Sequence, residues 1–243
     1  MKLLSVQLTI FSALITLSHL GYSEPWPGFG PTKPVSTYEK DEAYNPNFQF
    51  GQFRTYRPYQ DPEFAVGLSL PSPMLHPDYQ SYNIIVVIND NETNVNANVF
   101  GPPQSMRVYA KNANNDQKLL YFWNISTGID TANTKKGFYR PQRFSSRHWS
   151  GAYDAPMLSS VFFDAGRALH SSISTSDLEL MGKRRSSHGC VHVEDNRAEE
   201  LFHLIGNSGY GRVDLVAHNG KVVKGTDGKA KKVSSYKTLI IIY

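Results

Sequence analysis

The sequence contains a single cysteine, Cys190, among 243 residues. One cysteine cannot close a disulfide within its own chain, so internal disulfides are excluded as a source of stability. A chain of this length can bury an adequate apolar core without them. A free thiol outside the cytoplasm is exposed to oxidation. A secreted protein that keeps one is therefore expected to use it.

Beyond residue 23 the sequence also lacks any apolar run long enough to cross a bilayer. At the start, Lys2 is followed by a mostly apolar stretch, Leu3–Leu20, and then by Gly21-Tyr22-Ser23 with small residues at the first and third positions. This layout predicts a signal peptide over 1–23. We expect secretion across the inner membrane into the periplasm or cell wall, without stable membrane insertion. An uncleaved membrane anchor is the alternative.

No internal repeat and no basic motif with interleaved aromatic residues is present, so nucleic acid is not an expected partner. The net charge of +4 at pH 7 is compatible with anionic wall polymers, but it is mild. Imidazole and thiolate can bind metals, so a metal site made from His170, His188, Cys190 and His192 is an alternative. No second cysteine exists for the common Cys-x-x-Cys spacing. We therefore expect no metal and no cofactor.

Proline and aromatic residues are concentrated between Glu24 and Tyr82, which hold ten of the fourteen prolines and twelve aromatic residues. The prolines argue against long helices and central strands. The aromatic residues are too many for a plain disordered linker. We predict an extended arm over 24–82 that lays its rings on the following domain. A wall-binding or partner-binding segment is the alternative.

From residue 83 to 243 the pattern is that of a mainly β domain. Short runs rich in β-branched and aromatic residues, bounded by Asn, Gly and Asp, predict strands at 83–90, 105–111, 118–126, 159–166 and 237–243. Residues 211–223 are typical of a hairpin, with Asn219-Gly220 as a favoured two-residue turn.

One helix is predicted after the cysteine. Asp195 or Asn196 can cap its start, and Glu199 stands three residues after Asn196 as in a capping box. Gly206 suits its end. Its apolar stripe consists of Ala198, Leu201, Phe202 and Ile205.

The stretch around the cysteine reads "SSHGCVHV", Ser186–Val193. If it is extended, residues two apart share a face, so His188, Cys190 and His192 point the same way. A neutral thiol is a poor nucleophile and needs a helix N-terminus or a histidine to activate it. The predicted helix begins about five residues beyond the thiol, which is too far for its dipole to act. A histidine is therefore expected to activate Cys190.

Together with "LMGKRR" before it and "NRAEELFHL" after it, this motif resembles the catalytic signature of the L,D-transpeptidases, the YkuD-type domain. That family carries an upstream histidine, a Ser/Thr-His-Gly-Cys motif and then a helix. Weaker matches are "ISTG" at 125–128, "TKKGFY" at 134–139 and "DAPMLSSVFF" at 154–163. The resemblance covers 83–243 and implies a mixed β-sheet or sandwich domain. It also implies a secreted bacterial enzyme that remodels peptidoglycan.

The resemblance implies an acyl transfer on peptidoglycan stem tetrapeptides through a thioester on Cys190, with an amine as acceptor. His170 corresponds to the base, and the carbonyl of Ser171 orients it. The amides of Gly189 and Cys190 correspond to the donors that stabilise the oxyanion.

Four further residues are expected to bind substrate: His188, Ser187, His192 and Arg185. Arg185 is expected to attract an anionic stem peptide, although a solvated loop is an equal reading. His192 departs from the family, in which many members have arginine or asparagine, and imidazole cannot reproduce the rigid fork of arginine. Acceptor choice is open for this reason.

Two other functions remain open at this point. The same fold can use water as acceptor and act as a carboxypeptidase or endopeptidase. A catalytically inactive peptidoglycan-binding protein is the alternative from a different class, and an intact Cys190 and His170 argue against it. The oligomeric state stays open.

Overall fold

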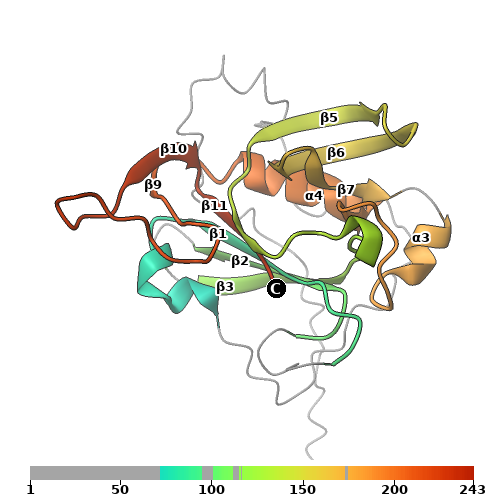
Figure 1. Cartoon of the computed structure of the whole chain (residues 1–243), viewed down its shortest axis with the longest axis horizontal. Coiled ribbons are helices and arrows are strands. Elements are labelled where there is room, and N and C mark those ends of the chain that lie inside the picture. The colour runs from blue at the N-terminus through green and yellow to red at the C-terminus, as the bar shows by residue number, and fades with distance from the viewer. Residues whose placement is uncertain (1–71, 95–100, 112–114, 116, 173–174) are drawn as a thin grey trace, which may run out of the picture.

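The computed structural model describes residues 72–94, 101–111, 115, 117–172 and 175–243 (Figure 1). The predicted signal peptide and most of the predicted arm lie outside the described residues. Within the described ranges, no helix is both long enough and apolar enough to span a membrane.

The described residues form two α-helices, three short 3-10 helices and eleven strands. The strands are β1 (Ile84–Asn89), β2 (Ser105–Lys111), β3 (Gln117–Asn124), β4 (Gly137–Tyr139), β5 (Arg143–Ser150), β6 (Ala155–Asp164), β7 (Arg167–Ser172), β8 (Val191–Glu194), β9 (Tyr210–Asp214), β10 (Lys232–Tyr236) and β11 (Thr238–Ile242). The helices are α3 (Thr175–Leu180) and α4 (Asp195–Gly206), with 3-10 turns η1 (Pro73–Leu75), η2 (Pro77–Tyr79) and η3 (Asp130–Ala132).

A five-stranded sheet in the order β3-β2-β1-β11-β4 forms one layer (Figure 1). The first and last strands of the domain, β1 and β11, pair in parallel at its centre, with Ile84 opposite Thr238 and Ile88 opposite Ile242. Every residue of these two strands is buried. Burial on both faces explains why their sequences are continuous apolar runs rather than alternating ones.

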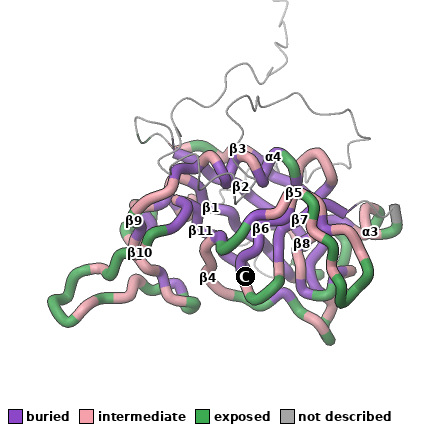
Figure 2. Tube along the Cα trace, turned by 90° about the horizontal axis from the view of Figure 1, so that it is seen from above, coloured by how far each residue is buried: buried purple, intermediate pink, exposed green. Residues whose placement is uncertain are grey.

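A four-stranded sheet in the order β5-β6-β7-β8 forms the second layer, and α4 packs against β6, β7 and β8. The main core lies between the layers, where Val86 and Val108 of the first sheet share one cluster with Val161 and Leu169 of the second and with Leu201 of α4. Figure 2 shows β1 and β11 as buried strands near the centre of the molecule. The predicted mainly β, sandwich-like fold is confirmed.

The opposite face of the five-stranded sheet is covered by the segment that precedes β1. Met74, Tyr79 and Tyr82 pack there with Ile85 and Ile241. The Tyr82 hydroxyl donates a hydrogen bond of 2.6 Å to the carbonyl of Asp214. In residues 72–82, therefore, aromatic side chains lie on the sheet.

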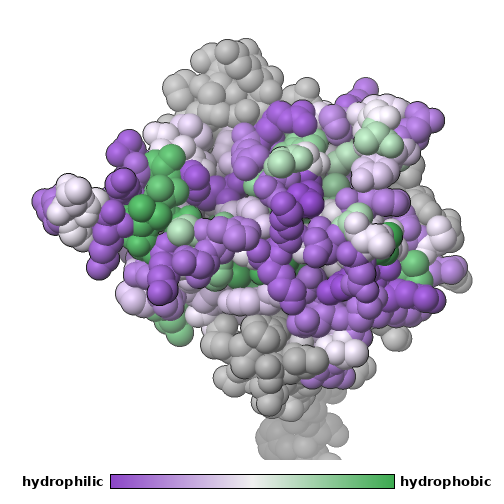
Figure 3. Space-filling view, in the orientation of Figure 1, coloured by the Kyte–Doolittle hydropathy of each residue, from purple (hydrophilic) through white to green (hydrophobic). Residues whose placement is uncertain are grey.

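The hairpin after β9 differs from the prediction in its turn. Val216 and Val222 bridge as expected, but the turn is closed by the Gly220 amide, which donates to the Ala217 carbonyl, and by the Ala217 amide, which donates to the Lys221 carbonyl. The loop therefore has three residues, with Gly220 at φ +85°. The predicted two-residue turn is wrong, because the glycine closes a type I-like turn instead of sitting at its centre. In the orientation of Figure 1, the surface of the molecule is mostly hydrophilic, with hydrophobic residues gathered on the side of β9 and β10 (Figure 3).

The helix α4 is confirmed, and its predicted apolar stripe is buried. Its predicted cap is wrong: the N-cap is Glu194, whose side chain makes no capping hydrogen bond. The reason is that β8 ends at Glu194 and α4 begins at the next residue, which leaves no loop in which Asp195 or Asn196 could act as a cap.

Candidate active site

The segment before β8 is a tight loop, so the prediction that Ser187–Val193 is extended is wrong for its first part. The Ser187 hydroxyl donates to the carbonyl of Cys190 at 2.6 Å and accepts from the amide of Gly189 at 3.1 Å. Gly189 has φ +105°, a conformation that favours glycine. The loop therefore turns the thiol out of the line of β8, which begins at Val191.

This loop is supported by two segments that carry the weaker family matches, 125–128 and 134–139. The Thr134 hydroxyl lies 3.1 Å from the Gly189 carbonyl and 3.2 Å from the Cys190 carbonyl, and it also accepts from the Gly128 amide. A Cβ on Gly128 would lie 2.7 Å from the Cα of Gly189. A glycine at 128 is therefore required for the close approach of the two backbones.

The parallel pairing of β7 and β8 brings the histidines together. His170 lies opposite His192, while Leu169 and Val191 pair one step away and point into the main core. Alternation along each strand then places both imidazoles on the outer face. Their ring centroids are 4.9 Å apart, with an interplanar angle of 73°.

A cavity of about 320 Å³ lies over this outer face. Its lining includes the thiol, the three nearby histidines and one carboxylate. The lining residues are Ser150, Tyr153, Ala155, Pro156, Met157, His170, Ser171, Ser172, Asp177, Ser186, His188, Cys190 and His192.

His170 is oriented by its neighbour in the chain. Its Nδ1 lies 2.7 Å from the carbonyl oxygen of Ser171. A carbonyl only accepts, so Nδ1 carries the proton and Nε2 keeps a free lone pair. Burial, together with the nearby His192, lowers the pKa of His170 to about 3. His170 is therefore a neutral imidazole at neutral pH, the form that can accept a proton.

The thiol of Cys190 is also neutral at rest. Burial raises its pKa, and a hydrogen bond from the Ala168 backbone and the positive charge of Arg167 offset this only in part. The raised pKa of the thiol and the lowered pKa of His170 both disfavour a preformed thiolate–imidazolium pair.

His188 lies at the exposed rim of the cavity. Its ring stacks on Tyr153 of the β5–β6 turn, with centroids 4.5 Å apart and an interplanar angle of 26°. This contact joins the cysteine loop to the β5–β6 hairpin across the cavity mouth.

Three predicted site residues have other contacts. The Gly189 amide donates to the Ser187 hydroxyl, and its role as an oxyanion donor stays a prediction. Ser187 is buried and holds the loop, and it is not among the lining residues. Arg185 also lies outside the cavity lining, because its guanidinium pairs with Asp90 and Asp130 at 3.4 and 2.5 Å. That Arg185 binds substrate stays a prediction, and its guanidinium already has two carboxylate partners.

Sequence reasoning missed Asp177 on α3. Its Oδ2 accepts a hydrogen bond from the Ser172 hydroxyl at 3.0 Å and lies 3.6 Å from Nδ1 of His192. No periodic pattern marked this short helix, and Asp177 meets His192 only through the fold.

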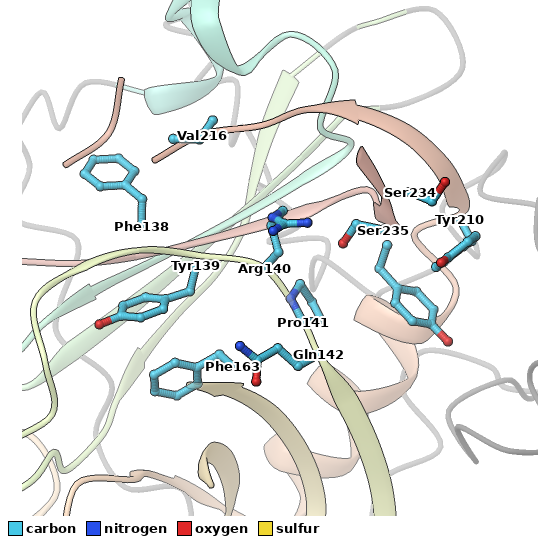
Figure 4. Close-up of a pocket in the computed structure, with 11 residues that line it drawn as sticks. Phe138, Tyr139, Arg140, Pro141, Gln142, Phe163, Tyr210, Val216, Ser234 and Ser235 are labelled. Carbon is cyan, nitrogen blue, oxygen red and sulfur yellow. The ribbon is translucent and has the colours of Figure 1, made fainter. Parts of the chain in front are cut away.

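A second, larger cavity of about 510 Å³ lies between the β4–β5 connection and the β9–β10 strands (Figure 4). Arg140 projects into it among aromatic rings and serine hydroxyls. Among its described lining residues there is no Cys, His, Asp or Glu. Within the described residues, no group of three or more His, Cys, Asp or Glu side chains is placed to hold a metal ion.

A thiol and a neutral imidazole oriented by a carbonyl, on the wall of one cavity, define the class of sites that perform nucleophilic acyl chemistry. Residues 81–224 match the family model of YkuD, the L,D-transpeptidase catalytic domain. This match covers more than half of the chain, so the protein belongs to this family. No curated protein matches the chain.

Solved structures with similar folds include an L,D-transpeptidase (Yku) from Stackebrandtia nassauensis, at 19% identity and TM-score 0.37, with 49% of each chain covered. Another is an L,D-transpeptidase from Mycobacterium smegmatis, at 14% identity and TM-score 0.44, covering 67% of this chain and 59% of that one. A third is the LD transpeptidase LdtMt1 in complex with imipenem, at 12% identity and TM-score 0.44, with the same coverage. The similarity spans about half to three fifths of those chains.

Proposed function

We propose that the protein is an L,D-transpeptidase that acts on peptidoglycan stem tetrapeptides, through a thioester on Cys190, and passes the acyl group to an amine. The observation that carries this proposal is that Cys190 and His170 line one cavity, with Nδ1 of His170 engaged by the Ser171 carbonyl. The family membership supplies the reaction class, and the cavity supplies room for a peptide.

The residues present support a two-step reaction. As Cys190 sulfur attacks the carbonyl carbon at the L,D bond, its proton moves to Nε2 of His170. The C–N bond then breaks, and the departing D-amino acid nitrogen takes that proton, leaving a thioester. Attack by an acceptor breaks the C–S bond and returns a proton to the sulfur. We propose the Cys190 amide as the oxyanion donor, since the Gly189 amide is engaged.

The proposed setting is the cell wall. We propose that residues 1–23 direct the chain across the inner membrane, that residues 24–82 form an arm, and that the mature enzyme works in the periplasm or wall. The partners in this proposal are the peptidoglycan stem peptides.

The experiment is mass spectrometry of the products formed from purified disaccharide-tetrapeptides. Cross-linked dimers identify a transpeptidase, whereas shortened tripeptides identify the hydrolytic variant of the same site. We expect Cys190→Ala and His170→Ala to lower turnover at least about a thousandfold, as losses of such paired groups do. His76→Ala is the matched control, because His76 is an exposed histidine outside the cavity lining.

A second measurement tests the thiol directly. LdtMt1 is known in complex with imipenem, and we expect a carbapenem to acylate Cys190 and raise the mass of the intact protein. Binding of muropeptides with no product and no adduct would support the inactive binding protein instead.

A further inference from the structure

The charge of the catalytic cavity points to the chemistry of its second substrate. Among the described lining residues, Asp177 is the one carboxylate, and there is no lysine or arginine. Burial lowers the pKa of His192 to about 4 and that of His170 to about 3, so neither imidazole balances this charge at neutral pH. The cavity therefore presents a net negative site to whatever enters it.

Asp177 accepts one hydrogen bond and has the His192 ring beside it. The Ser172 hydroxyl donates to Oδ2 at 3.0 Å, and Nδ1 of His192 lies 3.6 Å from the same oxygen. His192 in turn contacts His170 edge to face. The carboxylate is about a quarter exposed, at 27%. It is thus accessible from the cavity and separated from the proposed base by one imidazole.

The arginine expected to attract an anionic stem does not offset this charge. Arg185 is engaged by Asp90 and Asp130 and lies outside the cavity lining. Beside His192 lies a carboxylate, that of Asp177. Electrostatic complementarity then favours a cation over an anion at this end of the cavity.

We infer that Asp177 and His192 form a subsite for a protonated primary amine, the acceptor of the acyl group. This inference rests on the proposed function and deepens it, because it names the residues that bind the amine acceptor. A charge-assisted hydrogen bond to Asp177 holds the ammonium group near the thioester, where proximity lets it compete with water.

The proton balance closes with the residues present. The ammonium group has three hydrogens: one is released to water at the cavity mouth, and the freed nitrogen attacks the thioester carbonyl carbon. As the C–S bond breaks, a second hydrogen passes by way of His170 to the departing sulfur. The third stays on the new amide nitrogen.

The test is a partition experiment on the acyl-enzyme. A donor tetrapeptide is mixed with a diamino acid acceptor, and the ratio of aminolysis to hydrolysis products is measured. We expect Asp177→Asn, which keeps the side-chain volume and removes the charge, to lower this ratio about tenfold or more, since hydrogen bonds to charged groups are among the stronger ones. Asp177→Glu, which restores the charge, should recover much of the ratio.

Asp154→Asn is the matched control. Asp154 is an exposed carboxylate between Tyr153 and Ala155, so it is near the cavity mouth but not among the lining residues. The same change of charge there should leave the ratio within about twofold of the unmodified protein. An equal fall in both variants would overturn the inference.

A competition experiment on the unmodified protein gives a second test. A quaternary alkylammonium ion, which cannot react, should slow aminolysis without slowing hydrolysis, and an uncharged alcohol of similar shape should not. If the thioester forms but Asp177→Asn keeps its ratio, or if the ammonium ion slows both steps equally, the amine subsite is wrong while the proposed function stands. If no acyl-enzyme forms at all, the proposed function itself fails.

Discussion

Two of the cavities of the domain, the one over the cysteine and the one around Arg140, differ in chemistry more than in size. The smaller one, of about 320 Å³, holds a thiol, three imidazoles and a carboxylate. The larger of the two, of about 510 Å³, holds the guanidinium of Arg140 among aromatic rings and hydroxyls, and its described lining residues include no Cys, His, Asp or Glu. A reactive site is therefore marked by titratable groups that converge on one cavity, and cavity volume alone does not identify it.

The two cavities are also built differently. The smaller one is set by a parallel strand pair, β7 and β8, and by a loop that is hydrogen bonded to itself and to Thr134. The larger one lies between the edge strand β4 and the separate β9–β10 pair. A reacting sulfur needs the first kind of support, because a displacement of about 1 Å can cost about a hundredfold in rate.

Of the variants that test these differences between the cavities, Gly189→Ala is expected to have the largest effect on turnover. A Cβ at this position would lie 2.9 Å from Nε of Arg167, and φ is +105°. The strained backbone costs about 1–3 kcal/mol, and the loop must move. We expect a lower melting temperature and a fall in turnover of about a hundredfold or more.

Gly228→Ala is the control for that variant. Gly228 also has a left-handed φ, +74°, but a Cβ there meets nothing within 4 Å. We expect a modest loss of stability with turnover close to that of the unmodified protein. If both glycine variants reduced turnover alike, the shape of the cysteine loop would not be what supports catalysis.

The next effect concerns the protonation of the thiol. The raised pKa of Cys190 means less thiolate at neutral pH than in a free cysteine, so alkylation by iodoacetamide should be slow there and should rise with pH. We expect the midpoint of the rate profile to lie above that of the free peptide Ser-Ser-His-Gly-Cys-Val-His-Val. A midpoint below that of the peptide would instead indicate a preformed thiolate–imidazolium pair.

Much of the fold was accessible from the sequence, because local patterns determine it. The apolar runs that became β1 and β11 and the stripe that became α4 are buried as predicted. The strand β5 was not predicted, since its sequence RFSSRHWS is largely polar and it lies at a sheet edge. The pairing of β1 with β11 joins the two ends of the domain, and no local pattern encodes such a contact.

The candidate site, like the fold, was predictable from the sequence only in part. The motif predicts that Cys190 and His170 lie close together, and both line one cavity. The expectation that His188, Cys190 and His192 point the same way assumed an extended strand, and the strand begins only at Val191. Arg185 was assigned from its charge, and its pairing with Asp90 and Asp130 is a tertiary contact. Asp177 has no signal in the sequence, because its importance comes from its distance to His192.

The smallest effect is expected from a variant in the larger cavity, which tests whether that cavity takes part in the reaction. Arg140→Gln removes the cation from that cavity while keeping a polar side chain. The cavity contains no described group that belongs to the proposed reaction, so kcat/KM for muropeptides should change by less than about twofold. Arg212→Gln, at an exposed position on β9 outside both cavities, is the matched control. A large fall in kcat/KM for Arg140→Gln alone, with an unchanged melting temperature, would show that substrate reaches the larger cavity, because a guanidinium that only packs against rings would affect stability first.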